Sequence, residues 1–417
     1  MPGWDQMWRS FGRIGLLSFG GPAAQIAVMH RVLVDERRWL SEQQFLSALS
    51  FCMLLPGPEA MQLSTYAGWR LRGMAGGVLA GLLFVLPGAL VMLALAWGYA
   101  LWGALPAAQW AFLGIKAAII VIVLQALANV ARKALRTRWH WVIAGAAFMA
   151  IFAGNIPFPL VVVVAALLGA ALLPHGVDAP ARVPAVSLRQ SALRAMGWAV
   201  LWWAPIAMAA ALGAETLTEI GLFFSKLAVV TFGGAYAVLA YMAQEVVTGY
   251  GWLSAEAMID GLGLAETTPG PLILVTQFVG FQAGFGIGGP GMAVLAALMT
   301  LWVTFVPCFL WIFVGAPYVE VLTSQARLAG ALSAITSAVV GVILNLSVWF
   351  SLHVFFTRVD TVNIGALRLS LPDVTTFSLP ATGLAALAAI LLWLLRLPMT
   401  VTLALMALAG LGLGAIA

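Results

Sequence analysis

Long apolar segments recur along almost the whole chain, and no other feature restricts the possible folds as strongly. The clearest one, between Pro159 and Pro174, contains no polar or charged side chain. A helix crosses a bilayer with about 20 apolar residues, so the 417 residues of this chain leave room for on the order of ten crossings. Membrane β-barrel strands alternate in polarity, whereas these segments are continuously apolar. The sequence therefore predicts an all-α polytopic integral membrane protein.

The composition excludes an ordinary water-soluble protein. Only 8% of the residues are charged and 63% are hydrophobic, whereas about 25% of the residues of a soluble domain are charged. The 20 basic residues exceed the 15 acidic ones, but positively charged loops on the cytoplasmic side of a membrane produce such an excess. We therefore expect a lipid bilayer around the protein and no nucleic acid among its partners. A homo-oligomer is compatible with the sequence.

The apolar segments vary in length and in their content of Gly and Pro. The candidates are residues 11–30, 45–69, 73–102, 108–130, 141–156, 157–174, 195–213, 221–243, 257–280, 291–316, 328–356, 379–396 and 398–417. The segment 45–69 and the pair within 141–174 are broken, which is typical of re-entrant segments or half-helices. We predict 10–13 membrane segments.

The sequence lacks the motifs of several cofactor-dependent classes. It contains no GxxxxGK[ST] motif for binding phosphate, so ATP is not expected as the direct energy source. The histidines are scattered, and Cys52 and Cys308 form no CxxC pair, so we expect no haem, metal centre or disulfide framework. We predict no cofactor and no enzymatic activity, and transport would have to be secondary.

A tandem duplication becomes visible when the sequence is shifted by 213 residues. The shift superposes the Phe-Gly-Gly motif that begins at Phe19 on the one at Phe232, and Trp-Leu-Ser at Trp39 on the same motif at Trp252, without a gap. It also superposes Pro-Gly-Pro at residues 56–58 on residues 269–271. Chance similarity between apolar stretches does not align three separate motifs. The two halves are therefore copies of one repeat.

Charge indicates the orientation of the two copies. The first copy carries Arg31, Arg37, Arg38, Arg70 and Arg72 in its connections, whereas the second has no Lys or Arg between Lys226 and Arg327. Under the positive-inside rule, equivalent loops then lie on opposite sides of the membrane. We predict two inverted-topology repeats, namely an N-terminal domain at 1–174 and a C-terminal domain at 195–417. They are joined by a cytoplasmic linker at 175–194.

Each copy supplies two interruptions within apolar segments. Gly permits unusual backbone angles and Pro removes a hydrogen-bond donor, so Phe19-Gly20-Gly21-Pro22 and Pro56-Gly57-Pro58 disfavour a continuous helix. A helix that restarts after Pro-Gly-Pro presents free N–H groups and the positive end of its dipole, which suits an anion. A kink that serves only helix packing is the alternative. Interrupted helices in inverted repeats are typical of transporters.

Cations within apolar segments are further candidates. Arg13 and Lys226 are equivalent under the shift of 213, and Lys116 lies in another apolar segment. A cation inside the membrane costs about 2.5–3.5 kcal/mol on insertion scales, so such residues suggest an anion or a carboxylate partner. The alternative is that the side chains reach the interface by snorkelling.

Carboxylates flank the same interruptions. Glu59 follows the first Pro-Gly-Pro motif directly, and Glu266 and Asp260 precede the second. A buried carboxylate can exchange a proton and couple transport to a proton gradient, so Glu59 and Glu266 are candidates for proton coupling. Glu59 can equally be a helix-start residue stabilised by the helix dipole.

The motifs together resemble a known family. FGGP at 19–22, RVLVDERRWLSEQQF at 31–45 and MLLPGPEAMQLSTYAG at 53–68 look like the long-chain form of the chromate ion transporter (CHR) family, as do TFGGAYAVLAYM and TTPGPLILVTQFVGF in the second copy. The resemblance covers both halves and most of the chain. It implies a multi-pass protein of the bacterial inner membrane that exports chromate, driven by the proton motive force, and confers chromate resistance.

The resemblance and the repeat analysis together define a set of candidate residues. The candidates for binding the substrate are Arg13, Phe19, Gly20, Gly21, Pro22, Pro56, Gly57, Pro58, Lys226, Phe232, Gly233, Gly234, Pro269, Gly270 and Pro271. Ala235 replaces the proline of the first copy, so the two half-sites differ at this position. The expected mechanism is alternating access, in which one repeat rocks against the other around an oxyanion.

Two alternatives remain open at this point. Chromate is a tetrahedral dianion similar to sulfate, so a carrier of sulfate or of another oxyanion fits the same residues. A membrane-embedded scaffold or enzyme is the other alternative, although the sequence shows no catalytic constellation.

Overall fold

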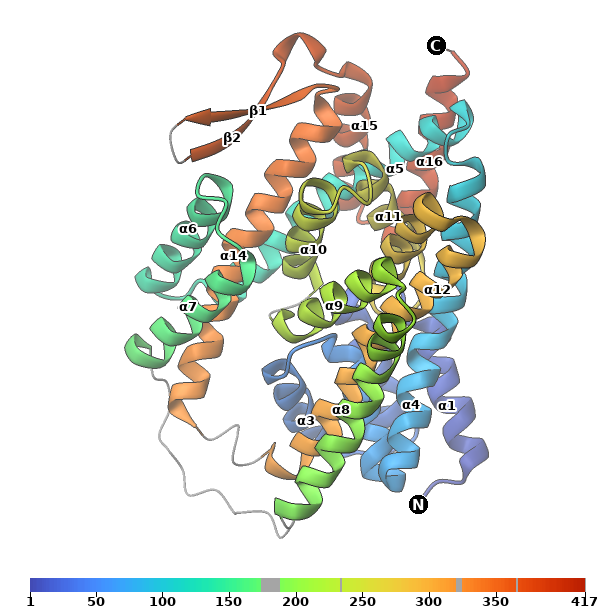
Figure 1. Cartoon of the computed structure of the whole chain (residues 1–417), viewed down its shortest axis with the longest axis vertical. Helices are drawn as coiled ribbons and strands as arrows, with labels where there is room; N and C mark the ends of the chain where they lie inside the picture. Colours follow the sequence, from blue (N-terminus) through green and yellow to red (C-terminus); the bar gives the residue numbers. More distant parts are fainter. Residues whose placement is uncertain (174–187, 233–234, 320–324, 365–366, 417) are drawn as a thin grey trace. The chain divides into compact units, whose positions relative to one another are not determined.

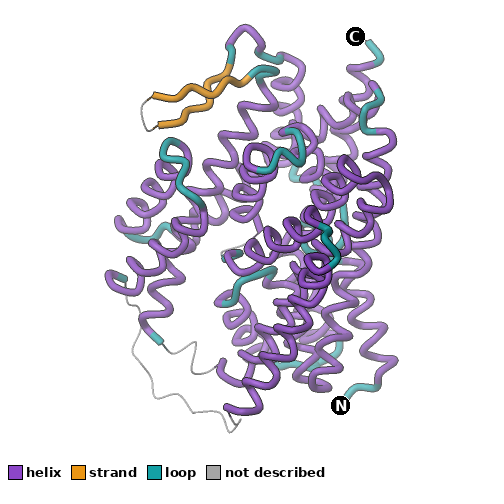
Figure 2. Tube along the Cα trace, viewed as in Figure 1, coloured by secondary structure: helices purple, strands orange, loops and turns teal. Residues whose placement is uncertain are grey.

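The computed structural model describes residues 1–173, 188–232, 235–319, 325–364 and 367–416. Nearly all of these residues lie in helices joined by short loops (Figure 2). Five helical stretches are long and apolar enough to cross a membrane: α4, α5, α14, residues 189–211 of α8 and residues 272–318 around α12. The predicted all-α polytopic membrane protein is confirmed.

The colours of Figure 1 follow the order of the elements along the chain. This order forms two similar series. The first series is α1 (Trp4–Leu17), α2 (Gly21–His30), the π-helical turn η1 (Arg31–Glu36), α3 (Glu42–Leu54), α4 (Glu59–Trp102), α5 (Pro106–Ala134), α6 (Arg138–Phe152) and α7 (Phe158–Leu172). The second part contains α8 (Leu188–Ala211), α9 (Glu215–Val230), α10 (Ala235–Gln244), the π-helical turn η2 (Glu245–Gly249), α11 (Ala255–Thr267), η3 (Leu272–Leu274), α12 (Val275–Gly315), η4 (Ala316–Tyr318) and α14 (Ala326–Phe355). The chain then forms β1 (Val359–Ile364), β2 (Leu367–Pro372), η5 (Val374–Thr376), α15 (Leu379–Ala389), η6 (Ile390–Leu394) and α16 (Met399–Gly414).

Several apolar helices are too short to cross a membrane alone. Helices α6 and α7 have 15 residues each, which corresponds to about 22 Å at 1.5 Å per residue, against a hydrocarbon core of about 30 Å. They occupy the range 141–174, where the sequence predicts broken segments. The broken segment 45–69 is likewise divided between α3 and the start of α4. The figure of 10–13 membrane segments includes such helices and stays a prediction.

The duplication extends to the local backbone geometry. Helices α3 and α11 have the same bounds under the shift of 213, and a π-helical turn precedes each of them. Helix α4 is kinked at Arg72 (φ −145°, ψ 33°) and Gly73 (φ 63°, ψ −157°), and α12 is kinked in the same way at Gly288 (φ −137°, ψ 15°) and Gly289 (φ 70°, ψ −162°). Both copies therefore specify the same succession of half-helices from the first interruption to the kink. Helix α8 lies between them and has no counterpart in the first series.

The chain forms two compact units, and each combines segments of both copies. Unit 1 comprises residues 1–97, 175–235 and 268–329, and unit 2 comprises residues 98–174, 236–267 and 330–417. The predicted domains at 1–174 and 195–417 follow the duplication rather than these units and stay a prediction. Of the predicted linker at 175–194, residues 175–187 lie outside the described residues, and α8 begins at Leu188.

Small residues permit close helix contacts within unit 2. Helices α5 and α16 lie side by side (Figure 1), and they approach most closely at Gly114 and Gly410. A Cβ atom on Gly114 would lie 1.9 Å from the carbonyl oxygen of Met406, and one on Gly410 would lie 2.1 Å from that of Trp110. Such contacts are typical of helix pairs in membranes, where packing rather than hydrophobic burial drives association.

A β-hairpin after α14 is a feature that the sequence analysis did not predict. Strands β1 and β2 pair in antiparallel register, with Val359 opposite Pro372. The bridge between Phe356 and Phe377 continues this pairing, and the two aromatic rings are 5.5 Å apart. The hairpin belongs to unit 2.

Candidate functional site

Each Pro-Gly-Pro motif forms a loop at the start of a helix in unit 1. Gly57 has a φ angle of 115° and Gly270 one of 84°, which side chains with a Cβ atom rarely adopt. Helix α4 starts at Glu59 directly after the first loop, and η3 followed by α12 starts at Leu272 after the second. The predicted interruption and restart of the helix are confirmed in both copies.

Each Phe-Gly-Gly motif also interrupts a helix. Helix α1 ends at Leu17 and α2 starts at Gly21, with φ angles of 86° at Gly20 and 80° at Gly21. In the second copy, α9 ends at Val230 and α10 begins at Ala235. Gly233 and Gly234, which the sequence analysis places at the site, lie outside the described residues.

Reciprocal hydrogen bonds connect the two kinds of interruption within unit 1. The backbone N–H of Gly57 donates to the carbonyl oxygen of Thr231 in the other copy, and that of Gly270 donates to the carbonyl oxygen of Ser18, each over 2.8 Å. Ser18 and Thr231 are themselves equivalent under the shift of 213. A pair of exchanged contacts of this kind is the pattern that an approximate two-fold axis produces. Each proline loop is therefore held by the helix end of the other copy.

The two acceptor residues were missed by the sequence analysis. Both side-chain hydroxyls donate to the carbonyl four residues earlier, from Ser18 to Ile14 and from Thr231 to Leu227, each over 2.6 Å. Ser18 and Thr231 are buried. The signal that would have found them is a small hydroxyl residue directly before Phe-Gly-Gly in both copies.

Buried glutamine amides lie beside the same loops. Gln25 donates through Nε2 to the carbonyl oxygen of Gly270 over 2.7 Å, and Gln62 donates to that of Pro56 over the same distance. Oε1 of Gln62 and Oε1 of Gln277 are buried without a hydrogen-bond partner among the described residues. Buried polar atoms are nearly always paired, so these two oxygens mark a polar environment with unused hydrogen-bonding capacity.

The loops differ in how deeply they are buried. All of Pro269, Gly270 and Pro271 are buried, whereas Pro56 and Pro58 are only half-buried around the buried Gly57. Helix α4 approaches the second loop so closely that a Cβ atom on Gly88 would lie 2.0 Å from the carbonyl oxygen of Pro269. The first loop of the pair is therefore the more accessible one.

The two equivalent cations have exposed side chains. Arg13 forms an ion pair with Glu36, with 2.7 Å between Nη1 and Oε2, and half of its side chain is exposed. Lys226 is exposed on α9. Phe19 and Gly20 are exposed as well, and Pro22 and Phe232 are half-buried. The structure thus brings together the two proline loops with Ser18 and Thr231, while Arg13 and Lys226 lie on exposed surface.

The two carboxylates proposed for proton coupling have different surroundings. Glu59 is the first residue of α4 and half-buried, and no basic side chain lies within ion-pair distance of it in the part of the chain that the structure describes. Glu266 in unit 2 is only 4% exposed, and its Oε1 accepts a hydrogen bond of 2.7 Å from the hydroxyl of Tyr236. A buried carboxylate without a cation is unfavourable unless it is protonated or well hydrogen-bonded.

A second group of charged residues lies inside unit 2. Lys116 on α5 and Asp260 on α11 form an ion pair with 3.7 Å between Nζ and Oδ1. The hydroxyl of Tyr99 donates to Oδ2 of Asp260 over 3.0 Å. The sequence analysis singled out Lys116 and Asp260 separately and did not pair them, because the spacing of two helices distant in sequence does not show which of their faces meet.

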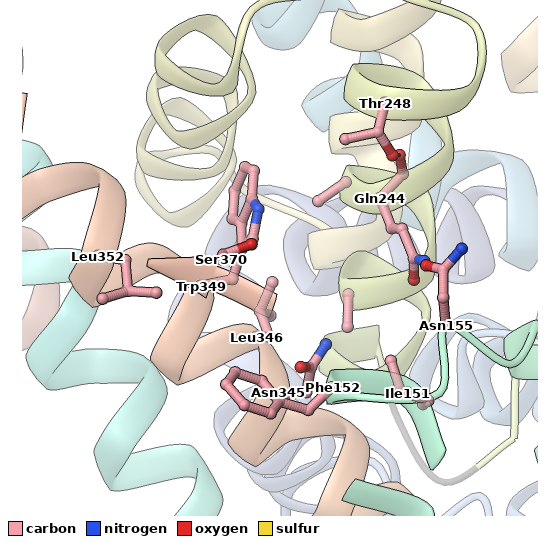
Figure 3. A pocket seen from close by; sticks show the side chains of 12 residues that line it. Ile151, Phe152, Asn155, Gln244, Thr248, Asn345, Leu346, Trp349, Leu352 and Ser370 are labelled. Atoms are coloured by element: carbon pink, nitrogen blue, oxygen red, sulfur yellow. Dashed lines mark hydrogen bonds between the residues drawn. The ribbon is translucent and has the colours of Figure 1, made fainter. Parts of the chain in front are cut away.

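A cavity of about 100 Å³ lies elsewhere in unit 2 (Figure 3). Neutral polar side chains line part of it, among them Asn155, Gln244 and Asn345. Nε2 of Gln244 donates to Oδ1 of Asn155 over 2.6 Å, which joins α10 to the turn after α6. None of the described lining residues carries a charge. The cavity offers hydrogen bonds but no cation to neutralise an anion.

Comparison with known proteins gives a consistent result over most of the chain. The family model for chromate transporters matches residues 5–170 and 218–412. A chromate transport protein of Pseudomonas aeruginosa is 35% identical over 415 residues, which cover 98% of this chain and 92% of that protein. A probable chromate transport protein of Synechococcus elongatus is 34% identical over 345 residues, covering 81% of this chain and 82% of that protein. An uncharacterized transporter of Methanocaldococcus jannaschii is 27% identical over 357 residues, covering 84% of each chain.

No solved structure matches this chain. The family match falls into two segments, which agree with the two copies found in the sequence, and the long apolar helices agree with a multi-pass membrane protein. On the strength of this match and of the relatives, the chain belongs to the chromate transporter family.

Proposed function

We propose that this protein is a secondary transporter that exports chromate across the bacterial inner membrane, driven by the proton motive force as an antiporter, and thereby confers chromate resistance. The observation that carries the proposal is the pair of reciprocally bonded Pro-Gly-Pro loops in a chain of the chromate transporter family. Two interrupted helices, one from each copy, are what a carrier needs to bind an ion near the middle of the membrane.

The chemistry of the loops suits an oxyanion. The helix that starts at Glu59 and the turn that starts at Leu272 leave backbone N–H groups without intrahelical partners, and their dipoles favour negative charge. The unpaired side-chain atoms of Gln62 and Gln277 are acceptor oxygens, and Nε2 of Gln62 already donates to Pro56, so the donors to the anion are the backbone N–H groups. A tetrahedral dianion is bound through several such donors together. Arg13 and Lys226 are assigned the role of attracting the anion from the exposed surface.

Glu59 links anion binding to protons in this proposal. Its carboxylate and the oxyanion require the same positively polarised helix start, and like charges at one site repel each other. The anion therefore binds when the carboxylate of Glu59 is displaced from the helix start. Glu59 takes up a proton only after the anion has left on the outside, so that the proton moves inward as the anion moves outward. Glu266, buried beside Tyr236, is the other candidate for carrying the proton. Opposite rocking of the two repeats exposes the site alternately to each side.

The direct test is the uptake of labelled chromate into everted membrane vesicles, with and without a proton gradient and with excess sulfate. The proposal expects uptake that requires the gradient and persists in the presence of sulfate. Uptake abolished by sulfate would instead assign a general oxyanion carrier. Absence of any flux from purified protein in liposomes would leave the scaffold or enzyme interpretation.

A matched pair of variants ties the flux to the loops. Gly57→Ala introduces a Cβ atom at a φ angle of 115°, whereas Gly286→Ala adds one at an exposed helical position with no atom within 4 Å. Flux should fall in the first variant and persist in the second, at equal amounts of inserted protein.

A further inference from the structure

The charged group formed by Lys116, Asp260 and Tyr99 has no role in the proposed oxyanion site, yet it is buried. The exposed fractions of the Lys116 and Asp260 side chains are 13% and 7%. Charged groups inside a membrane protein are unfavourable and generally mark ion pathways or proton relays. The question is whether this group is a structural ion pair or binds a ligand.

The geometry is that of a loose pair rather than of a structural one. A buried ion pair is favourable only when hydrogen bonds satisfy the remaining lone pairs and protons of both groups. Here the contact of 3.7 Å between Nζ and Oδ1 is too long for a hydrogen bond. Oδ1 of Asp260 is buried without a hydrogen-bond partner among the described residues. The carboxylate therefore presents one vacant acceptor oxygen.

The repeat does not include the charges of this group. Helices α3 and α11 are equivalent and have the same length, but Ser47 occupies the position of Asp260 in the first copy. The shift of 220 that superposes Pro87 on Pro307 places Thr336 opposite Lys116 and Val319 opposite Tyr99. The equivalent positions of the repeat thus hold three residues without charge. Helices α3 and α14 therefore form without charges at the positions that correspond to Asp260 and Lys116.

We propose that Asp260 is a proton-binding site, which takes up a proton on Oδ1 when Lys116 moves away and releases it when the pair forms again. The proposal rests on the proposed transport function only in assigning this proton to the transport cycle. A proton is the ligand that fits a single vacant carboxylate oxygen, since the described residues contain no group of three side chains that could hold a metal ion.

The groups that face Asp260 leave few other candidates for this proton. Lys116 on α5 and Tyr99 after the kinked part of α4 contact its two oxygens. Glu256 lies about one turn earlier on α11 and is exposed, so its negative charge acts from the solvent side. Helix α16 also packs against α11, and its sequence contains no titratable residue. Asp260 is therefore the buried carboxyl group of this cluster.

Infrared difference spectroscopy of the full-length protein in lipid tests the site without requiring transport. Lowering the pH should produce the absorption band of a protonated carboxyl group, and Asp260→Asn should remove one such band. Glu256→Gln, on the same helix, is the matched control and should leave the band in place. In Lys116→Met the band should persist to higher pH, because the cation that favours the ionised form is gone. A spectrum of Asp260→Asn that equals the wild-type spectrum at every pH would overturn the proposal.

Proton movement in proteoliposomes tests the assignment to the transport cycle. Asp260→Asn should cause a partial loss of the protons moved per chromate while chromate flux persists, because Glu59 carries its own proton in the proposed cycle. The double variant Lys116→Met/Asp260→Asn, which removes both charges, guards against a misfolded single variant and should behave in the same way. Unchanged proton movement in both variants would overturn the assignment. Absence of chromate flux in the wild type would refute the proposed function and leave the infrared result to decide on the proton site.

Discussion

The two copies of the repeat share the backbone geometry of their interruptions and differ in their carboxylates. Gly57 and Gly270 have positive φ angles and exchange equivalent hydrogen bonds with Thr231 and Ser18. By contrast, the carboxylates have neutral counterparts under the shift of 213: Glu59 corresponds to Leu272, Glu266 to Met53 and Asp260 to Ser47. Backbone geometry present in both copies forms a common frame for binding and movement. The carboxylates, each present in only one copy, are the part that can give the cycle its coupling to protons.

The largest effect is expected from breaking the shared backbone. Gly57→Ala and Gly270→Ala each place a Cβ atom at a φ angle that costs about 1–3 kcal/mol outside glycine. Each loop is hydrogen-bonded to the other copy, so strain in either loop affects both copies. We expect chromate flux to fall more than about tenfold in either variant, because roughly 1.4 kcal/mol of strain corresponds to a factor of ten. Flux per inserted molecule in proteoliposomes is the measurement.

The comparison of chromate flux between Gly57→Ala and Gly270→Ala shows whether the two half-sites are functionally equivalent. Gly286→Ala, at an exposed position with free space, serves as the control in the same preparation. If one loop tolerates alanine while the other does not, then the two half-sites are not functionally equivalent, and the reciprocal bonds are only structural.

The sequence was sufficient to predict the fold class, the duplication and the helix interruptions. These depend on hydrophobicity, on Gly and on Pro, whose effects are local, so Pro56-Gly57-Pro58 and its counterpart could be identified without knowledge of their neighbours. The kinks at Gly73 and Gly289 follow from the same local rule but escaped notice, because only the backbone angles distinguish them from ordinary glycines in apolar helices.

Pairings over long distances in the sequence could not be predicted. The contact of Lys116 with Asp260 and the bonds from Gly57 and Gly270 depend on which helix faces meet, and apolar helices in membranes have no polar face that specifies this. The hairpin β1–β2 could not be predicted from apolar segments, because its strands are short and mix polar with apolar residues. The sequence also could not show that Arg13 and Lys226 are exposed. A cation that reaches the interface by snorkelling and a cation that binds an anion inside the protein look the same in the sequence.

The variant Glu59→Gln tests whether a carboxylate that only one copy carries couples transport to protons. The variant keeps the shape of the side chain and removes its charge, so Glu59 no longer competes with the oxyanion for the start of α4. We expect chromate flux to remain within about fivefold of the wild type and to lose its dependence on the proton gradient, a change of roughly 1 kcal/mol in binding. Leu272→Gln, at the equivalent buried position of the other copy, is the matched control and should leave the gradient dependence in place.

Initial rates of uptake at several pH values, with and without an imposed gradient, provide the measurement for both variants. A gradient dependence that survives in Glu59→Gln but disappears in Glu266→Gln would assign the proton that Glu59 carries in this proposal to Glu266 instead. The two copies would then still differ in their carboxylates, but Glu266 rather than Glu59 would carry the coupled proton.

A smaller effect is expected from the equivalent cations. Lys226→Gln removes an exposed charge, and Arg13→Gln also breaks the ion pair with Glu36. Exposed charges act mainly by long-range attraction that salt screens. We therefore expect the KM for chromate to rise about two- to fivefold in each variant at low ionic strength, with kcat unchanged and a smaller effect in high salt. A loss of kcat in Lys226→Gln, with normal membrane insertion, would instead place Lys226 in contact with the transported ion. Unchanged kinetics would remove it from the site.

The smallest effect concerns a charged connection that only the first copy has. His30 is hydrogen-bonded to Glu42 over 2.7 Å and lies 3.4 Å from Asp35, outside the five long membrane helices, and its equivalent is Ala243. The hydrogen bond with Glu42 raises the pKa of His30 above its ordinary value of 6.5, although burial opposes the shift. Because the folded-state pKa is raised, the stabilisation is fully present below pH 6.5 and is lost as the pH rises through the folded-state pKa.

His30→Ala should therefore lower the free energy of unfolding by less than about 1 kcal/mol at acidic pH and leave it nearly unchanged at alkaline pH. Thermal unfolding in detergent at both pH values, with Ala243→Ser as the control in the other copy, is the measurement. An equal loss of stability at both values would show that His30 acts by packing against Phe45, whose ring lies 5.1 Å away, rather than through its charge.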